Sequence, residues 1–226
     1  MKTMKKTILL LITIISMNTI RAQKRSKSSL DIGADLASRY VWRGIEFSDS
    51  PVIQPYVEYT LGNLTLGIWA SYETGGQVIG QEFDLYASYS FGAVSLGFTD
   101  YSFPVDGLSD RYFQLKNHVG ELMVSFEGVK KLPLTLMLAM NIYNDNANSI
   151  YTKIEYPFKI GDVELSTFIG GGNKIYTVDK DFAITNVGFS ASRDVKITSL
   201  VSLGMSVSAI FNPNTEDAYL VFLISL

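Results

Sequence analysis

The sequence has no cysteine and a single histidine, His118, among its 226 residues. These absences exclude a disulfide framework, thiolate metal ligands, a cysteine nucleophile and any cluster of histidines around a metal. Charged residues make up only 18% of the chain, below the roughly 25% of an average soluble domain. Hydrophobic residues reach 47%, which excludes intrinsic disorder. We expect one folded unit with no cofactor and no metal site.

Long apolar runs are also missing beyond the N-terminus. No later stretch approaches the roughly 20 apolar residues that a membrane-spanning helix needs, and no long segment shows the apolar stripe of an amphipathic helix. At the N-terminus itself, lysines precede the short apolar run 7–15, and Ala22 offers a small residue for cleavage. This pattern predicts a secretory signal peptide at 1–22, a short polar lead-in at 23–29 and a single domain at 30–226.

Cleavage after Ala22 would also change the charge of the chain. It would remove Lys2, Lys5, Lys6 and Arg21, leaving 15 of the 19 basic residues against 22 acidic ones, a net charge of −7. A mature chain this acidic has no basic footprint for nucleic acid. We therefore expect no nucleic-acid partner.

The rest of the chain alternates with a period of two. In 64–73, for example, apolar residues at even positions alternate with Thr65, Gly67, Trp69 and Ser71. Alternate side chains of a strand point to opposite faces, so one face is apolar and the other small, polar or charged. About twelve such runs occur, near 30–43, 52–61, 64–73, 82–91, 93–101, 117–127, 134–143, 149–160, 163–170, 182–192, 199–211 and 217–226. Runs of about ten residues with this alternation are typical of transmembrane barrel strands.

The connections between these runs fall into two classes that alternate along the chain. One class is short, at 62–63, 92, 128–133, 161–162 and 192–198. The other is longer and more polar, at 44–51, 74–80, 102–116, 144–148, 171–181 and 212–216. Bacterial outer-membrane barrels have short periplasmic turns and longer outer loops. An even number of strands would place both termini in the periplasm.

Aromatic residues near the strand ends favour the membrane barrel over a soluble β-sandwich or a lipocalin-type barrel. Amphipathic rings prefer the membrane–water interface. We expect Tyr40, Trp42 and Tyr72 at the outer rim, and Tyr59, Phe91, Tyr156 and Phe158 at the inner rim. The sequence thus predicts an all-β fold: an antiparallel up-and-down transmembrane β-barrel of about 12 strands in the outer membrane of a Gram-negative bacterium, after a cleaved signal peptide.

The stretch from Ser38 to Glu73 carries a motif. Its elements are an opening S-R-Y-x-W-R-G-I, a P-x-I-Q element, an acidic–Tyr pair and G-x-W-x-S, which fall on 38–45, 51–54, 58–59 and 67–71. This block resembles the TorF-type porin family, bacterial outer-membrane proteins of unknown function. The resemblance implies a channel. One departure is the C-terminus: barrels of this kind commonly end in an aromatic residue that the barrel-assembly machinery reads, and this chain ends in Leu226.

Charged residues of the motif share one parity. A charged Arg or Lys facing mid-bilayer lipid costs about 2–4 kcal/mol, so Arg39 and Arg43 should face the lumen, together with Gln54, Glu58 and Asp84. One hypothesis is that these residues line a constriction and set charge selectivity. The alternative, which we favour, is that Arg39 and Glu58 form an internal salt bridge that braces the barrel, because charges removed from water are usually paired.

Predicted lumen acids outnumber the lumen bases Arg39, Arg43 and Lys153. The acids are Asp31, Asp35, Glu58, Glu82, Asp84, Glu121, Glu155 and Glu164. A barrel of about twelve strands lies between filled small barrels and open porins. We expect passive diffusion of small polar or cationic solutes. The first alternative is a non-conducting structural or adhesive barrel that binds a partner through its outer loops, 102–116 above all.

Enzymatic readings have weak support. A lipid-active enzyme would have to use His118, which we place on the lipid side near the outer rim, and a lone histidine does not make a triad. The glycines of 170–173 lack the lysine and the spacing of a phosphate-binding loop. Asn and Asp in 144–148 could ligate Ca²⁺ through oxygen, but we favour a solvated loop tip by far. We expect no enzyme.

Overall fold

A computed structural model describes residues 28–75, 81–103, 112–199 and 201–226 of the chain. The predicted signal peptide lies outside the described residues, as does most of the lead-in. Ser28 and Ser29, which we expected in the lead-in, instead begin the first strand.

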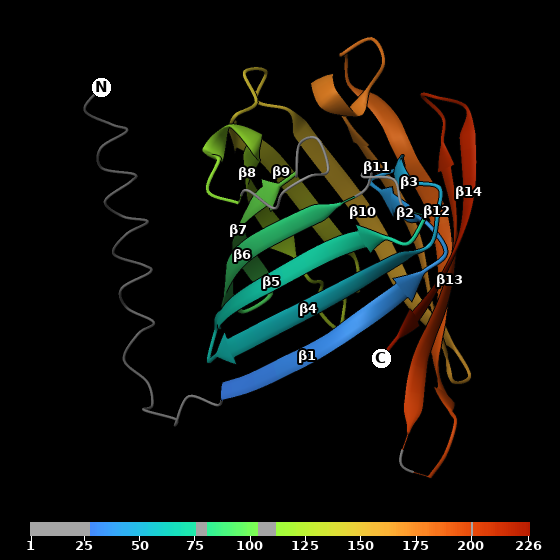
Figure 1. The fold of residues 1–226 in the computed structure, drawn as a ribbon. Coiled ribbons are helices and arrows are strands. Elements are labelled where there is room, and N and C mark those ends of the chain that lie inside the picture. The colour runs from blue at the N-terminus through green and yellow to red at the C-terminus, as the bar shows by residue number, and fades with distance from the viewer. Residues whose placement is uncertain (1–27, 76–80, 104–111, 200) are drawn as a thin grey trace.

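Twelve antiparallel strands close into a barrel (Figure 1), which confirms the predicted fold class and strand number. Its wall runs in the order β1-β14-β13-β12-β11-β10-β9-β8-β7-β6-β5-β4, so each strand pairs with its neighbour in the chain and β1 closes on β14. The wall strands are β1 Ser28–Ala37, β4 Val52–Leu61, β5 Leu64–Glu73, β6 Glu82–Phe91, β7 Val94–Ser102, β8 His118–Phe126, β9 Thr135–Tyr143, β10 Ile150–Ile160, β11 Val163–Gly172, β12 Ala183–Lys196, β13 Ser202–Asn212 and β14 Asp217–Ser225.

The main difference from the predicted strands concerns the run 30–43. The first wall strand ends at Ala37, and a separate two-stranded hairpin follows, made of β2 Tyr40–Trp42 and β3 Ile45–Ser48. The stretch 44–51 is therefore not an outer loop, as we expected, because it supplies the turn and the second arm of this hairpin. Alternation alone cannot detect the break, since β1 and β2 carry the same period of two.

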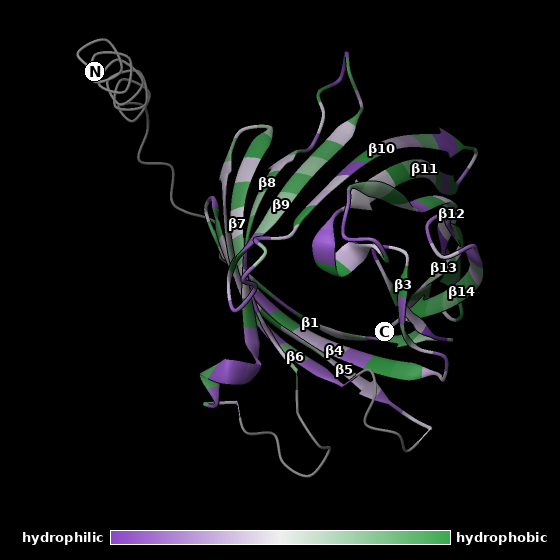
Figure 2. Ribbon diagram, turned by 90° about the horizontal axis from the view of Figure 1, so that it is seen from above, coloured by the Kyte–Doolittle hydropathy of each residue, from purple (hydrophilic) through white to green (hydrophobic). Residues whose placement is uncertain are grey.

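The two faces of the wall differ in polarity as predicted. On β5, Leu66 and Ile68 are 46% and 41% exposed on the outer face, while Gly67 and Ser71 are buried on the inner face. The same alternation places Leu138 outside on β9, at 53% exposure. The wall therefore has an apolar outer face and an inner face of small, polar and charged side chains. Figure 2 shows apolar and polar residues interspersed along the strands.

The predicted alternation of short and long connections holds only in part. Tight turns at 62–63, 92–93 and 161–162 lie at one end of the barrel, but the longer connection 127–134 lies at that end too, and at the other end only 213–216 joins β13 to β14. Gly92 and Gly161 adopt φ of 74° and 62°, a left-handed conformation that glycine reaches at little cost. Only two short 3₁₀ helices occur in the described ranges, η1 Leu115–Asn117 and η2 Lys174–Tyr176. None of the described helices is long and apolar enough to cross a membrane.

The seam that closes the barrel is short. β14 pairs with β1 only from Asp35 to Ala37, while β4 pairs with β1 from Ser28 to Ala37. Two further backbone bonds extend the seam, from the Leu226 N–H to the Ala34 carbonyl and from the Ser38 N–H to the Phe222 carbonyl. Because β1 and β14 are antiparallel neighbours, the start of β1 and the end of β14 lie at the same end of the barrel.

Candidate functional site: a hairpin folded into the barrel

The hairpin β2–β3 lies inside the ring of strands (Figure 2). Its turn is formed by Arg43 and Gly44, whose φ angles of 55° and 82° both lie in the left-handed region. A Cβ atom on Gly44 would lie 1.7 Å from the backbone oxygen of Thr185 on β12. Only glycine therefore allows the turn to approach the barrel wall this closely. The R-G pair of the motif is the tip of a hairpin seated against β12.

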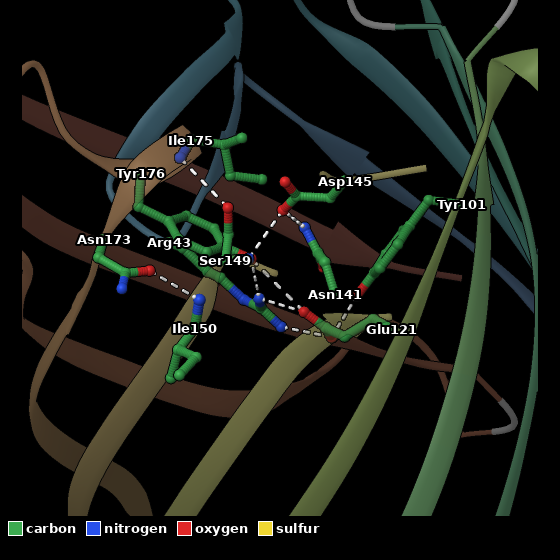
Figure 3. Close-up of polar contacts among 10 residues, drawn as sticks. All are labelled: Arg43, Tyr101, Glu121, Asn141, Asp145, Ser149, Ile150, Asn173, Ile175 and Tyr176. Atoms are coloured by element: carbon green, nitrogen blue, oxygen red, sulfur yellow. Dashed lines mark hydrogen bonds and ion pairs between the residues drawn. The ribbon is translucent and has the colours of Figure 1, made fainter. Parts of the chain in front are cut away.

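Arg43 anchors this tip through a buried ion pair with Glu121 of β8 (Figure 3). Arg43 Nη1 donates to Glu121 Oε2 at 2.5 Å, and Nη2 donates to Oε1 at 2.8 Å. The side chains are only 7% and 2% exposed. Bidentate guanidinium–carboxylate pairs are among the stronger and more directional polar contacts. The pair therefore joins the hairpin firmly to the opposite wall.

Aromatic side chains complete the surroundings of Arg43. Arg43 Nη1 also donates to the Tyr176 hydroxyl at 2.6 Å, and the Tyr101 hydroxyl donates to Glu121 Oε1 at 2.9 Å. The guanidinium carbon lies 4.2 Å from the Trp42 ring centroid and 4.6 Å from that of Tyr151. Such cation–π contacts strengthen when they are shielded from water. Burial alone would lower the pKa of Arg43, but the hydrogen bonds with Glu121 raise it, so the guanidinium stays charged.

Backbone contacts fix the same turn from a third direction. Asn212 Nδ2 donates to the Gly44 carbonyl at 2.9 Å, and Thr185 Oγ1 donates to the Arg43 carbonyl at 3.2 Å. Both carbonyls therefore have side-chain partners from β12 and β13, as buried backbone groups require.

The base of the hairpin is held by two further contacts. Arg39 pairs with Glu46 across the hairpin at 2.6 Å, with side chains 34% and 29% exposed. The Tyr40 hydroxyl donates to Glu82 Oε2 at 2.8 Å. Burial and the adjacent Glu82 carboxylate raise the pKa of Tyr40, so its hydroxyl remains a donor.

These contacts correct the predicted salt bridge. Arg39 does not pair with Glu58, which instead accepts a hydrogen bond from the Tyr86 hydroxyl at 3.1 Å. The reason is that Arg39 follows the end of β1 and turns inward with the hairpin. Glu58 lies on β4, opposite Asp31 near the start of β1. An internal arginine–glutamate brace does exist, but Arg43 and Glu121 form it.

The predicted rim aromatics divide into two groups. Tyr59 and Tyr72 are 41% and 44% exposed on the outer face of the wall, and their interface role stays a prediction. The prediction was wrong for Tyr40 and Trp42, which lie inside the barrel because they belong to the hairpin. Tyr40 is only 8% exposed and packs against Trp69 at 5.6 Å between ring centroids.

The remaining predicted lumen residues line the space beside the hairpin. Gln54 is 7% exposed, and its Nε2 lies 3.5 Å from Ser71 Oγ. Asp84 is 5% exposed, and its Oδ1 has no hydrogen-bond partner in the part of the chain that the structure describes. Both residues border a cavity of about 350 Å³ between the hairpin and the wall.

Sequence reasoning missed most of the hairpin's anchors. It placed Glu121 among the lumen acids but gave it no partner, and it assigned no role to Tyr176, Thr185 or Asn212. A mid-strand glutamate of lumen parity was a signal for Glu121. Tyr176 and Asn212 carried no local signal, because their contacts depend on which parts of the wall the hairpin reaches.

The loop 144–148 is ordered by its own hydrogen bonds. Asp145 accepts from the backbone N–H groups of Ala147 and Ser149, each at 2.9 Å, and from Asn141 Nδ2 at 3.1 Å. Burial opposes ionisation of Asp145, but these hydrogen bonds outweigh it and lower its pKa. The carboxylate therefore serves as an internal acceptor of the loop. Within the described ranges, no cluster of three or more potential metal ligands occurs.

His118 begins β8 on the outer face of the wall and is only 1% exposed. Its Nδ1 contacts both carboxylate oxygens of Asp100, at 2.9 and 3.0 Å, and its Nε2 contacts the Tyr112 carbonyl. A triad needs a nucleophile at the nitrogen opposite the carboxylate, and that nitrogen faces a carbonyl oxygen here. The Tyr112 hydroxyl donates to Asp100 at 2.8 Å. The geometry is that of a structural cluster.

Comparison with solved structures finds distant resemblance to porins. A porin of Rhodopseudomonas blastica aligns with 9% identity and a TM-score of 0.41, over 77% of this chain and 55% of the porin. OccK5 (OpdH) of Pseudomonas aeruginosa aligns with 10% identity and a TM-score of 0.37, over 91% of this chain and 68% of that protein. The chain thus spans little more than half the length of the first porin.

No curated protein matches the sequence. The model of the Gcw_chp family, described as a bacterial protein of unknown function, matches residues 21–207. The TorF name stays a prediction. Since the match covers the hairpin, its anchors on β8 and β12 and most of the wall, the chain belongs to the Gcw_chp family.

Proposed function

We propose that this chain is an integral outer-membrane barrel through which small polar or cationic solutes diffuse passively. The observation that carries the proposal is the polarity of a closed sheet, apolar outside and polar within. In lipid every backbone N–H and C=O needs a partner, and a closed barrel supplies one along its wall. Both termini would then lie in the periplasm, and insertion would depend on the lipid of the outer membrane and the barrel-assembly machinery.

The hairpin is the element that would control passage. It narrows the lumen at the Arg43–Glu121 pair, with a cavity of about 350 Å³ beside it. A second cavity of about 350 Å³ borders the hairpin near Glu46, Ile175 and Asp217. Arg39 lines the first cavity and its partner Glu46 lines the second, so the Arg39–Glu46 pair separates the two. We place the constriction at these two ion pairs.

Charge pairing in the lumen favours cations. Among the predicted lumen acids, Glu121, Glu155 and Glu164 pair with Arg43, Lys153 and Lys159. In the described part of the chain, no ion pair involves Asp31 and Asp35 of β1 or Glu58 of β4. Unpaired charges of one sign concentrate counter-ions in a low-dielectric channel.

The anchoring of the hairpin supports a second candidate, a non-conducting barrel that binds a partner through its outer loops. The tip is held by one ion pair and several hydrogen bonds. A hairpin attached this firmly would not move aside to let solutes pass. The chemistry around His118 offers no support for the third candidate, a lipid-active enzyme.

Conductance separates these candidates. The refolded protein is reconstituted into planar bilayers and into liposomes, with protein-free vesicles as the control. The channel proposal predicts discrete conductance steps, swelling that depends on solute size, and a preference for K⁺ over Cl⁻. Absence of both steps and swelling would favour the non-conducting barrel, and anion preference would overturn the role of the acidic wall. Fractionation of cells that express the chain tests the outer-membrane location.

A further inference from the structure

The short seam between β1 and β14 leaves the first part of β1 with a free edge. β4 pairs with β1 over its whole length, Ser28–Ala37, whereas β14 pairs only with Asp35–Ala37 and the Leu226 N–H adds one bond to the Ala34 carbonyl. Figure 1 shows β4 on one side of the start of β1 and no described strand on the other. Because even-numbered residues of β1 direct their backbone groups toward β14, those of Leu30 and Ile32 have no backbone partner among the described residues.

The exposure of the outer face agrees with a missing neighbour. Ile32 and Leu30 are 66% and 61% exposed, whereas Val57, which faces Ile32 on β4, is 38% exposed. Within lipid, unpaired backbone groups are costly and open sheet edges do not occur. A free edge is also a template on which another strand can pair. This edge therefore calls for a strand that the described residues do not supply.

A second copy of this barrel does not suit the position. Copies inserted in the same direction can bring their β1 strands together only in parallel. The two-fold rotation that relates them would then set the lipid-facing side of one β1 beside the lumen-facing side of the other. A strand from a different chain has no such constraint. It would reach the edge at the end of the barrel where β1 begins, which we place in the periplasm.

The inner face of the edge favours a basic partner. Asp31 is exposed and faces Glu58 of β4. Neither acid forms an ion pair within the described part of the chain. Like charges directly opposite each other on a sheet are destabilising. A lysine or arginine on an added strand would lie beside Asp31 and offset this repulsion. Its alternate apolar residues would extend the outer face that Leu30 and Ile32 begin.

We propose that the free edge of β1 binds an extended, basic segment of a periplasmic protein, which adds as an antiparallel strand in line with β14. Main-chain hydrogen bonds to Leu30 and Ile32 supply the attachment, and the alternate side chains supply the specificity. The inference rests on the proposed outer-membrane location, which sets the side from which the edge is reached, and not on conductance.

The absence of cysteine from the chain lets one engineered thiol report the added strand. Ser29 has the parity of Asp31, so it would form a non-hydrogen-bonded pair with the added strand, and such close pairs suit a disulfide. Ser29→Cys is mixed in detergent micelles with an end-blocked peptide of alternating valine and lysine, in which an activated cysteine disulfide replaces one lysine. Thr60→Cys is the matched control, because Thr60 lies opposite Ser29 on β4 but is flanked by β5 on its other side.

The expected result is linkage about tenfold faster at Ser29→Cys than at Thr60→Cys, after each rate is divided by that of the same thiol with a small uncharged disulfide. Added to Ser29→Cys, Leu30→Pro removes an N–H from the free edge and none from the β1–β4 ladder, so it should slow linkage. Asp31→Asn should slow linkage about threefold, as expected for an exposed ion pair. If Leu30→Pro fails to fold, a peptide N-methylated at its valines lacks the N–H groups that face β1 and should link no faster than at Thr60→Cys.

Four results would overturn the inference. They are equal corrected rates at Ser29→Cys and Thr60→Cys, equal rates with the N-methylated and unmethylated peptides, faster linkage of a peptide with glutamate in place of lysine, and a Ser29→Cys dimer that excludes the peptide. The last would show that a second copy fills the edge.

Bilayer conductance of the same preparation distinguishes this failure from failure of the proposed function. Conductance without peptide linkage rejects the added strand and keeps the channel. Peptide linkage without conductance supports the added strand and rejects the channel.

Discussion

At the scale of single residues, two buried carboxyl groups differ in the hydrogen bonds that they accept. Glu121 receives two hydrogen bonds from Arg43 and one from Tyr101, whereas Asp84 keeps one oxygen without a donor. Breaking a buried ion pair by removing one partner costs much more than the pair contributes, because the remaining charge stays desolvated. Glu121 is therefore suited to hold the hairpin against the wall.

Glu121→Gln should destabilise the barrel by about 3–5 kcal/mol, because it leaves the buried Arg43 guanidinium without a counter-charge. The measurement is the free energy of unfolding by urea in lipid vesicles, followed by tryptophan emission. Glu164→Gln is the control, since the Lys159–Glu164 pair is 59% and 67% exposed and should contribute nothing measurable. Equal stability of Glu121→Gln and wild type would show that the pair does not hold the hairpin.

At the scale of elements, the hairpin is the feature that distinguishes this barrel from a plain up-and-down wall. Two short strands suffice because side chains from β8, β12 and β13 hold the tip, and an isolated two-stranded hairpin is only marginally stable. Gly44 makes this docking possible by its positive φ and by the absence of a Cβ atom.

Gly44→Ala should displace the tip from β12 and raise the single-channel conductance, because a Cβ atom would overlap the Thr185 backbone oxygen. Gly92→Ala is the matched control. Gly92 also has a positive φ, 74°, but a Cβ atom there would meet nothing within 4 Å. Both substitutions strain a turn by about 1 kcal/mol. The two variants therefore differ only in whether the hairpin can still pack against β12. If both variants conduct like wild type, the hairpin is not the constriction.

At the scale of the whole molecule, closure depends on the short seam between β1 and β14. Because even-numbered residues of β1 exchange backbone bonds with β14, Ala37 and Leu223 form a non-hydrogen-bonded pair. Such pairs bring Cα atoms to about 4.5 Å, which suits a disulfide. The chain has no native cysteine, so an engineered bridge can be interpreted without competing thiols.

The double substitution Ala37→Cys and Leu223→Cys should form an intramolecular disulfide under mild oxidation and stabilise the barrel by about 2–4 kcal/mol. Gel mobility without reductant and urea unfolding with and without reductant measure the two effects. Ala37→Cys with Leu203→Cys is the control, because Leu203 pairs with Val195 of β12 and not with β1. Absence of the first cross-link would contradict a closed seam.

Membrane insertion predicts an asymmetry between the two faces of the wall. Ile68→Arg places a charge at the middle of the outer face of β5 and should cost about 2–4 kcal/mol in lipid bilayers. Ser206→Arg places the same charge beside a lumen cavity of about 660 Å³ and should cost little. Folding in vesicles, titrated with urea, measures both. Equal costs on the two faces would argue against a lipid-facing exterior.

Local patterns in the sequence were enough to predict the wall of this barrel. A period of two is a local property, so residues 52–61, 64–73 and 82–91 predicted three strands whose bounds match the structure. Turn glycines and loop lengths predicted the hairpin connections for the same reason. Parity also placed Asp84 and Gln54 on the inner face, because the face that a side chain occupies follows from its position along its own strand.

What fills the lumen depends on contacts that exist only in the folded barrel. Tyr40 and Trp42 continue the alternation of β1, and nothing local reveals that the chain leaves the wall after Ala37 and folds inward. The partner of Arg43 lies 78 residues away and becomes its neighbour only when twelve strands close into a ring. The strand pattern predicts whether a side chain lies on the inner or the outer face of the wall. Contacts across the lumen depend on the curvature and closure of the whole sheet.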